Sequence, residues 1–281
     1  MQHPFNVLAP EYTSLLAAMK INTSRASQLS SRADAILGLA SHHADEWAEV
    51  FATTAVPKLW GLASFERESG SDYACSPAQG DRWDRRSIHV PSGLGPYPNW
   101  GASCVAAYRI DHLDLIGEKG WTWDRACYDG ELFNGFGPRN HGRHTGYLWA
   151  WSNIYTGGKY VSDGVWSPTT FDQQCGMAPL MMEMLRLDPS LALADGWPDA
   201  ADPAIAVPPP QPVPDGVGGG AEDAEWIQMQ LNKFGASPPL TVDGNYGRVT
   251  RRAVAAFQGQ HHLTVDGIAG PQTIAKMKGL A

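Results

Sequence analysis

The stretch that decides the fold is SFERESGSDYACSPAQGDRWDRRSIHVP, residues 64–91. It begins at the end of an apolar segment, and its first acidic residues are Glu66 and Glu68. Gly70 then interrupts the pattern, and the run of Gly, Asp, Ser and Pro that follows cannot form a long helix. The stretch therefore predicts a buried helix over 57–69 that carries two carboxylates at its C-terminal end.

A carboxyl group at the C-terminal end of a buried helix is a candidate general acid. Burial removes water from the charged form and the negative end of the helix dipole repels it, so both effects favour the protonated acid. Such an acid can keep its proton near neutral pH and give it to a leaving group. The alternative is that Glu66 and Glu68 are ordinary acids of a solvated turn, and the local sequence leaves both interpretations open.

The composition describes a globular protein with more than one domain. At 281 residues the chain exceeds the usual size of a single core. Its net charge of −8 argues against nucleic acid as the main partner. Eleven tryptophans favour a sugar-binding or interface role only weakly, because most tryptophans pack in cores.

The sequence gives no sign of a membrane protein or of a cofactor. No uncharged run approaches the roughly 18 to 20 apolar residues of a membrane span, so we expect no membrane insertion. The N-terminal residues lack the basic region and apolar core of a secretion signal. We expect a monomer without a metal or another cofactor. The widely spaced cysteines are expected to be free thiols: Cys75, Cys104, Cys127 and Cys175.

The hydrophobic pattern predicts a mainly α-helical first domain with a small β-hairpin. Beyond the helix over 57–69, we expect helices over 25–41, 45–54, 99–116, 122–133, 146–153 and 169–187. The segment SIHV indicates a strand, which places the hairpin within 78–98. In the helix over 169–187, Phe171 and a stripe of methionines are expected to face the core.

A linker divides the chain. Residues 198–221 read PDAADPAIAVPPPQPVPDGVGGGA, a stiff Pro-rich part followed by a flexible Gly-rich part. We therefore expect a first domain over 1–197 and a second over 222–281. In the second, LTVDGNYGRVTRRAV (240–254) is repeated as LTVDGIAGPQTIAKM (263–277), which predicts a small three-helix unit. Its expected core contains Leu231, Val254, Phe257, Leu263 and Ile274.

The repeat resembles the peptidoglycan-binding domain found on many cell-wall hydrolases. The resemblance covers about 225–278 and rests on LNKFG, VDGNYGRVTRRAVAAFQ and VDGIAGPQT. It implies that peptidoglycan is the partner, and that the binding surface includes Asp243, Gly244, Tyr246, Gly247 and Arg248. Because a tethered binding module raises the local concentration of its neighbour on the polymer, the first domain is expected to act on peptidoglycan.

Residues 57–168 resemble bacteriophage-type lysozymes and endolysins. The motifs are RESG (67–70), QGDRWD (79–84), SIHVP (87–91), FNGFG (133–137) and YLWAWSNIYTGGKYVSDG (147–164). The resemblance implies an α+β, lysozyme-like hydrolase that cleaves the β-1,4 bond between N-acetylmuramic acid and N-acetylglucosamine and so lyses a host cell. Such an endolysin stays in the host cytoplasm until it is released to the periplasm and cell wall.

The resemblance also implies catalytic roles. Glu68 corresponds to the catalytic glutamate. Asp81 is the expected second carboxylate, because it follows Gly80 in the hairpin that faces the helix end, and Ser87 or His89 would position a water. The alternative for Asp81 is turn chemistry, since Asp after Gly is common in turns.

Aromatic and amide side chains further along the chain are candidates for a sugar cleft. Aromatic faces can cover the apolar sides of pyranose rings, and Asn amides can bind N-acetyl groups, although aromatic residues mostly pack in cores. The candidates are Tyr128, Asn134, Tyr147, Trp149, Asn153 and Tyr155.

Three other functions stay open at this point. A lytic transglycosylase would cut the same bond with the muramoyl 6-hydroxyl as the attacking group. A zinc peptidase or amidase needs His and acidic ligands, and the chain has no H-E-x-x-H; a close arrangement is His141-x-x-His144. A wall-binding protein without activity is the third.

Overall fold

Helices dominate the computed structural model, which describes residues 4–78, 80–89, 93–162, 165–195, 224–236, 239–242, 244, 248–261, 263 and 269–280. The α-helices are α1 (Phe5–Ala18), α2 (Ala26–Ser41), α3 (Ala44–Thr54), α4 (Lys58–Ser69), α5 (Trp100–Ile110), α6 (Trp123–Asn134), α7 (Gly146–Trp149), α8 (Met177–Leu187), α9 (Ala224–Lys233), α10 (Arg248–Gln260) and α11 (Pro271–Leu280). Strands β1 (Lys159–Ser162) and β2 (Val165–Ser167) form an antiparallel pair. The mainly helical fold with a small sheet is as predicted.

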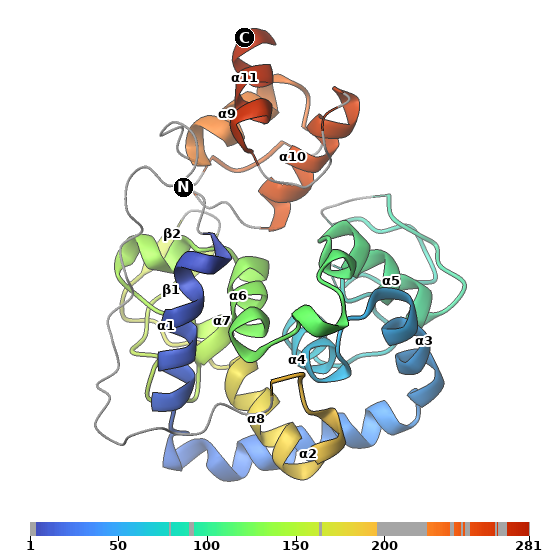
Figure 1. Ribbon diagram of the computed structural model, residues 1–281, viewed down its shortest axis with the longest axis vertical. Helices are drawn as coiled ribbons and strands as arrows, with labels where there is room; N and C mark the ends of the chain where they lie inside the picture. The colour runs from blue at the N-terminus through green and yellow to red at the C-terminus, as the bar shows by residue number, and fades with distance from the viewer. Residues whose placement is uncertain are drawn as a thin grey trace.

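Helix α4 runs through the middle of the larger group of helices, with α3 and α5 on one side and α1 and α6 on the other (Figure 1). Residues Leu59 to Phe65 are all buried. The indole nitrogen of Trp60 donates to the carbonyl of Ala126 at 3.0 Å, which ties α4 to α6. The predicted buried helix over 57–69 is therefore confirmed, and its last turn carries the two glutamates.

Gly61 allows α4 to lie close to its neighbours. A Cβ atom at this position would be 2.6 Å from a ring carbon of Trp47 and 2.8 Å from the hydroxyl of Tyr108. Both distances are shorter than van der Waals contact, so a larger residue would push α4 away from α3 and α5. The packing at Gly61 thus sets how close α4 lies to α3 and α5.

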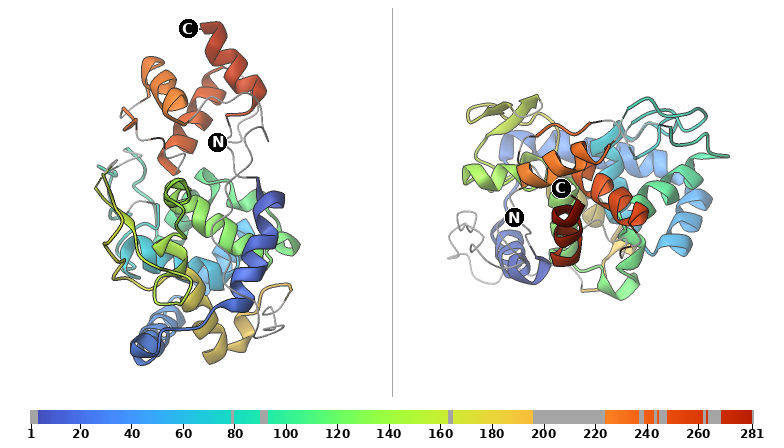
Figure 2. Two further views of the ribbon diagram at one scale, coloured as in Figure 1. Left: turned by 90° about the vertical axis from the view of Figure 1, so that its left-hand side faces the viewer. Right: turned by 90° about the horizontal axis from the view of Figure 1, so that it is seen from above.

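The hairpin lies elsewhere than predicted. Residues 159–162 pair with 165–167, and Figure 2 shows this hairpin (yellow-green) at the edge of the helices. Ser87, Ile88 and His89 of the predicted SIHV strand are not in a strand. The reason is that the backbone N–H groups of Ile88 and His89 donate to a side chain, the carboxylate of Asp81, instead of to a partner strand.

Helix α8 begins eight residues later than predicted, at Met177 instead of at residue 169. Its methionine stripe is buried as expected, but Phe171 is 53% exposed, so its predicted place in the core is wrong. A Cβ at Gly176 would lie 2.5 Å from the carbonyl oxygen of Leu148. The backbone just before α8 therefore passes directly against α7, and Gly176 itself is extended (φ −69°, ψ 154°).

The buried apolar side chains form two separate clusters, one drawn from residues 8–193 and one from 227–277. In the second, the predicted core residues Leu231, Val254, Phe257 and Ile274 are buried, and Leu263 is half-buried. The sequence repeat of this second unit is matched by two equivalent hydrogen bonds. The buried Gln228 amide donates to Thr250, and the buried Gln258 amide donates to Thr273 in the same way.

All four cysteines lie among the described residues, and each is a free thiol, as expected. Burial raises the pKa of the Cys104 thiol to about 12. In the part of the chain that the structure describes, no helix is long and apolar enough to cross a membrane.

Candidate active site

The site is built around Glu68, in the last turn of α4. Gly70 ends the helix in the left-handed conformation (φ 63°), which glycine adopts without strain. The hydroxyl of Tyr147 donates to Oε1 of Glu68 at 2.9 Å. This hydrogen bond fixes the carboxyl group against α7, although the two residues are 79 positions apart in the sequence.

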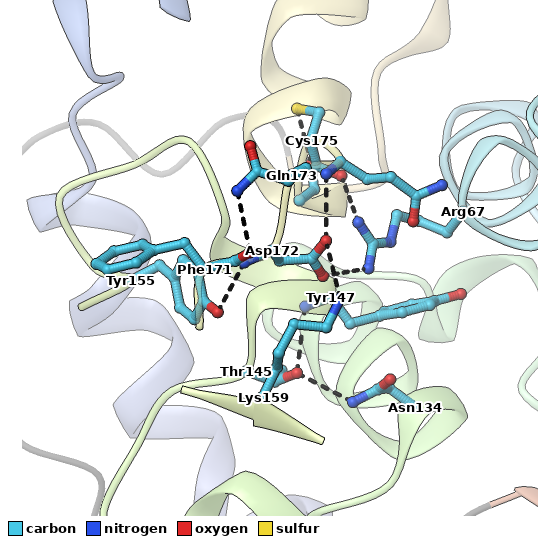
Figure 3. Close-up of polar contacts among 12 residues, drawn as sticks. Arg67, Asn134, Thr145, Tyr147, Tyr155, Lys159, Phe171, Asp172, Gln173 and Cys175 are labelled. Carbon is cyan, nitrogen blue, oxygen red and sulfur yellow. Dashed lines mark hydrogen bonds and ion pairs between the residues drawn. The ribbon is translucent and has the colours of Figure 1, made fainter. Parts of the chain in front are cut away.

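Tyr147 is held in turn by the start of α7. Thr145 caps this short helix, because its hydroxyl accepts the backbone N–H of Tyr147 at 3.2 Å. The amide of Asn134, at the end of α6, donates to the same hydroxyl at 3.0 Å (Figure 3). The position of the Tyr147 ring beside Glu68 therefore depends on α6 as well as on α7.

A buried ion pair, Arg67 with Asp172, packs against the ring of Tyr147. The guanidinium carbon of Arg67 lies 4.6 Å from the centre of the Tyr147 ring, a cation–π contact. Arg67 pairs with Asp172 at 2.7 Å and donates to the carbonyl of Cys175 at 3.1 Å (Figure 3). The side chains of Arg67 and Asp172 are only 6% and 7% exposed, so the pair is almost free of solvent screening.

The electrostatics of Asp172 follow from this pair. Burial raises the pKa of Asp172, but the Arg67 guanidinium, together with Lys159 and the backbone N–H of Gln174, lowers it further, so the pKa lies below its usual value. Lys159 adds a second cation 3.6 Å from the carboxylate. Asp172 is therefore an ionised anchor that keeps Arg67 over the Tyr147 ring.

Glu66, the other acid of the opening stretch, is bound to structural partners. Its carboxylate accepts two hydrogen bonds from the Arg32 guanidinium, of which the one from Nε is 2.7 Å long. It also accepts a hydrogen bond from the hydroxyl of Ser71 at 2.7 Å. Arg32 also donates to the carbonyl of Gly70 at 2.9 Å. These bonds tie α2 to the end of α4, so Glu66 holds the helix end that presents Glu68.

Asp81 lies in the loop after α4, and its carboxylate is fully engaged. Oδ2 accepts the backbone N–H groups of Ile88 and His89, each at 2.9 Å, and Oδ1 lies 2.7 Å from Nδ1 of His89. Burial would raise the pKa of Asp81, but the hydrogen bonds from His89 and Ile88 lower it further than burial raises it. Asp81 is thus an ionised residue that organises the loop.

Ser87 fixes the same loop from its other end. Its hydroxyl accepts the backbone N–H of Leu94 at 3.0 Å, and its own N–H donates to the carbonyl of Leu94 at 2.9 Å. The residue is only 7% exposed. In this structure Asp81 and Ser87, the predicted second carboxylate and water-binding hydroxyl, are both engaged in holding the loop.

The predicted sugar-cleft residues are dispersed. Tyr147 lies at Glu68, and Asn134 is exposed and close to it through Thr145. Tyr155 is buried behind Asp172, where its hydroxyl accepts the backbone N–H of Asp172 at 3.1 Å. Tyr155 therefore supports the anchor of Arg67.

The other three candidates are occupied by packing or by hydrogen bonds elsewhere. Trp149 is completely buried and has no surface on which a sugar could stack. Asn153 accepts the backbone N–H of Lys20 at 2.6 Å, beyond the end of α1. Tyr128 is half-buried, with its ring 5.4 Å from that of Phe5 and at a steep angle to it.

The sequence interpretation missed the supporting residues Arg67, Thr145 and Asp172. Arg67 stands directly before Glu68, and this position was the only local signal for it. Asp172 lies 105 residues after Arg67, and no spacing rule connects the two.

Potential metal ligands are scattered in the described part of the chain. No three His, Cys, Asp or Glu side chains there come together as a metal site. His144 is buried with Nδ1 3.7 Å from Glu11, next to the buried pair of Arg139 with Glu131, whereas His141 stacks on Trp166. The two histidines of H-x-x-H thus belong to different surroundings.

Of the predicted wall-binding residues, the structure describes Gly244 and Arg248. Asp243, Tyr246 and Gly247 lie outside the described residues. Gly244 has φ 69° and donates its N–H to the side chain of Gln228 at 3.0 Å, and Arg248 begins α10. The Gln228 side chain therefore joins Gly244 to Thr250, the second threonine of the first repeat.

Comparison with known proteins identifies the C-terminal part. Residues 220–277 match the sequence model of the peptidoglycan binding domain family. A zinc D-Ala-D-Ala carboxypeptidase from Streptomyces albus G is 36% identical over 61 residues, which are 21% of this chain and 24% of the relative, so about a quarter of that relative is covered. No solved structure matches the chain. The chain therefore carries a peptidoglycan-binding domain, and its function is related to the bacterial cell wall.

Proposed function

We propose that the protein is a lysozyme-type peptidoglycan hydrolase that cleaves the β-1,4 bond between N-acetylmuramic acid and N-acetylglucosamine. The observation that carries the proposal is the carboxyl group of Glu68, which is held by Tyr147 at the end of a buried helix in a chain that also contains a peptidoglycan-binding domain. In this proposal Glu68 is the general acid that protonates the leaving oxygen.

The surroundings of Glu68 suit that role. Hydrolysis of a glycoside needs an acid at the leaving oxygen, positioned before the substrate arrives. The hydrogen bond from Tyr147 fixes the orientation of the carboxyl group, and the Arg67–Asp172 pair fixes Tyr147. The acid therefore needs little reorganisation to reach a reactive geometry.

The C-terminal domain would hold the enzyme on its polymeric substrate. By binding peptidoglycan it would keep the catalytic residues at a high effective concentration on an insoluble polymer. We propose that this tethering serves an endolysin-like role, in which the enzyme acts as a monomer after release from a host cytoplasm and degrades the wall during lysis.

The direct test is Glu68→Gln, which removes the acidic proton and keeps the shape of the side chain. We expect the loss of lytic activity on purified cell walls by about a hundredfold or more, while wall binding by the full chain is retained. Glu66→Gln is the matched control, because Glu66 pairs with Arg32, and it should lower stability more than activity. If Glu66→Gln loses lysis and Glu68→Gln keeps it, the assignment of the acid is wrong.

The similarity to a zinc carboxypeptidase supports a second candidate, a peptidase on the same polymer. A peptidase would release amino groups or D-alanine and would be inactivated by a chelator, whereas the proposed hydrolase would release new reducing sugar ends and keep its activity. A lytic transglycosylase would instead release 1,6-anhydro sugar ends. Mass spectrometry of the soluble products distinguishes the three activities in one digestion.

A further inference from the structure

We propose that His89 is the general base of the reaction and that Asp81 positions it. The inference rests on the proposed glycan hydrolysis and replaces the expected direct role of Asp81. It assigns removal of a proton from the attacking water to the imidazole, with Glu68 as the acid on the leaving group. A histidine in this place would make the reaction an inverting hydrolysis.

The hydrogen bonds of Asp81 determine which ring nitrogen of His89 can act as a base. An ionised carboxylate only accepts hydrogen bonds, so the proton between Oδ1 and Nδ1, 2.7 Å apart, belongs to Nδ1 of His89. In the neutral ring Nε2 then carries the lone pair. Among the described residues none hydrogen-bonds to Nε2, so this atom can accept a proton from water.

Exposure separates the two residues of the pair. The side chain of His89 is 70% exposed, whereas that of Asp81 is 14% exposed and accepts three hydrogen bonds from the loop. A base must contact the water that it activates. The geometry therefore favours His89 as the group that meets the water and Asp81 as the residue that orients the ring, as carboxylates orient histidines in other catalytic pairs.

The loop that carries the pair starts beside Glu68. A Cβ atom at Gly80 would lie 3.2 Å from the carbonyl oxygen of Glu68, so the backbone before Asp81 runs against the last turn of α4. Gly80 has φ 74°, which a residue with a side chain rarely adopts. The N–H of Ser76 also donates to the carbonyl of Asp81 at 2.7 Å.

The loop is fixed beyond His89 as well. Ser87 exchanges backbone and side-chain hydrogen bonds with Leu94, and the N–H of Gly93 donates to the carbonyl of Ser87 at 2.8 Å. With Asp81 bound to the backbone of residues 88 and 89 and to Nδ1 of the ring, both the backbone at His89 and the ring are held by one carboxylate. A base held in this way is positioned before the substrate binds.

The reaction balances with these two residues alone. Glu68 gives its proton to the glycosidic oxygen of N-acetylglucosamine, and the bond from that oxygen to C1 of N-acetylmuramic acid breaks. The water oxygen forms the new bond to C1, and the proton of that water passes to Nε2 of His89. Solvent then takes the proton from His89 and restores the proton of Glu68. Attack from the opposite face yields the α-anomer of the new reducing end.

The first experiment removes the base and supplies it again. We expect His89→Ala to lower the release of reducing ends from purified peptidoglycan by about a hundredfold. Free imidazole added to His89→Ala should restore a large part of this activity, because it can occupy the space of the missing ring. His42→Ala is the matched control, because His42 is an exposed histidine in the turn between α2 and α3. The activity of this variant should equal that of the wild type and should not change when imidazole is added.

The second experiment tests whether Asp81 acts through His89. Asp81→Asn should lower activity in the wild-type chain but have little further effect in His89→Ala, since the residue that it positions is then absent. Asp84→Asn is the matched control, because Asp84 pairs with Arg82 on the surface of the same loop. The unfolding midpoint of each variant, followed by tryptophan fluorescence, shows that the chain remains folded.

The outcomes separate this inference from the proposed function. If the wild-type chain releases no reducing ends, the proposed hydrolysis fails and His89 loses its role with it. If the wild-type chain is active and His89→Ala is equally active, or imidazole does not restore activity, only the assignment of His89 fails. Proton NMR of fresh products gives an independent answer, because a β-anomer would exclude inversion and so overturn the inference.

Discussion

Two acid–base pairs of opposite kinds lie on segments next to Glu68, one packed against Tyr147 and the other in the loop whose backbone passes Glu68 at Gly80. In the first, Arg67 and Asp172 form an ion pair that is 6% and 7% exposed and lies against Tyr147. In the second, His89 is 70% exposed and is bound to Asp81 in a surface loop. Both pairs join a carboxylate to a nitrogen group at 2.7 Å, so the difference lies in burial and not in distance.

The difference in burial predicts different functions for the two pairs. Removal of one partner of a buried ion pair is strongly destabilising, because the other charge is left unpaired and away from water. An exposed pair contributes little to stability, but its nitrogen can meet water and substrate. We therefore expect changes on the Arg67 side to affect folding first, and changes on the His89 side to affect chemistry first.

The largest effect is expected from Asp172→Asn. The substitution leaves the Arg67 guanidinium buried without its counter-charge, and we expect the free energy of unfolding to fall by about 3 to 5 kcal/mol. Urea unfolding followed by tryptophan fluorescence measures this change. Lys159→Gln is the matched control, because Lys159 approaches the same carboxylate at 3.6 Å but is 37% exposed, so its loss should have a much smaller effect. Equal effects of the two substitutions would contradict the importance of burial.

The next effect is on activity, from Tyr147→Phe. The phenylalanine ring would still lie under Arg67, but Glu68 would lose the hydrogen bond that orients its carboxyl group. We expect the rate of wall hydrolysis to fall about tenfold, equivalent to about 1.4 kcal/mol of transition-state stabilisation. Tyr12→Phe is the matched control, because that hydroxyl donates to a different glutamate, Glu131, in another buried cluster. An equal loss of activity in both variants would indicate general destabilisation.

Low pH should selectively weaken the buried ion pair between Arg67 and Asp172. The pKa of Asp172 is lower in the folded state than its usual value of about 4, so the ion pair contributes its full stability above that pH. This contribution is lost as the pH falls through the lowered folded-state pKa, because the carboxylate then takes up a proton. The stability difference between wild type and Asp172→Asn should therefore shrink between about pH 5 and about pH 2 in urea unfolding. A constant difference across this range would show that Arg67 does not stabilise the charge.

The buried helix at the centre of the fold could be predicted because its signal is local. The apolar run from Leu59 to Phe65 and the break at Gly70 are contiguous in the sequence, and they indicate both the burial of α4 and the place where Glu68 ends up. The core of the C-terminal unit could also be predicted, because a sequence repeat indicates a repeated structure.

The role of Asp172 could not be predicted, because its contact with Arg67 joins residues that are 105 positions apart. At Asp81 the missed contact is local, because its carboxylate takes the backbone N–H groups of Ile88 and His89 that a strand there would have used. Propensity alone cannot detect a side chain that competes with regular structure. Both missed contacts involve the carboxylates of the two pairs, Asp172 and Asp81.

The smallest effect on stability is expected from His89→Ala, and it completes the comparison. The ring is mostly in solvent, so its removal exposes little apolar surface, and Asp81 keeps its two backbone hydrogen bonds from Ile88 and from residue 89. We expect the urea midpoint to stay within the error of the wild-type value. A chain that retains its stability and loses hydrolysis would assign His89 to the chemistry, because a purely structural residue would change both. If stability falls as far as in Asp172→Asn, the exposed pair is a structural support like the buried one, and the two pairs do not differ in function.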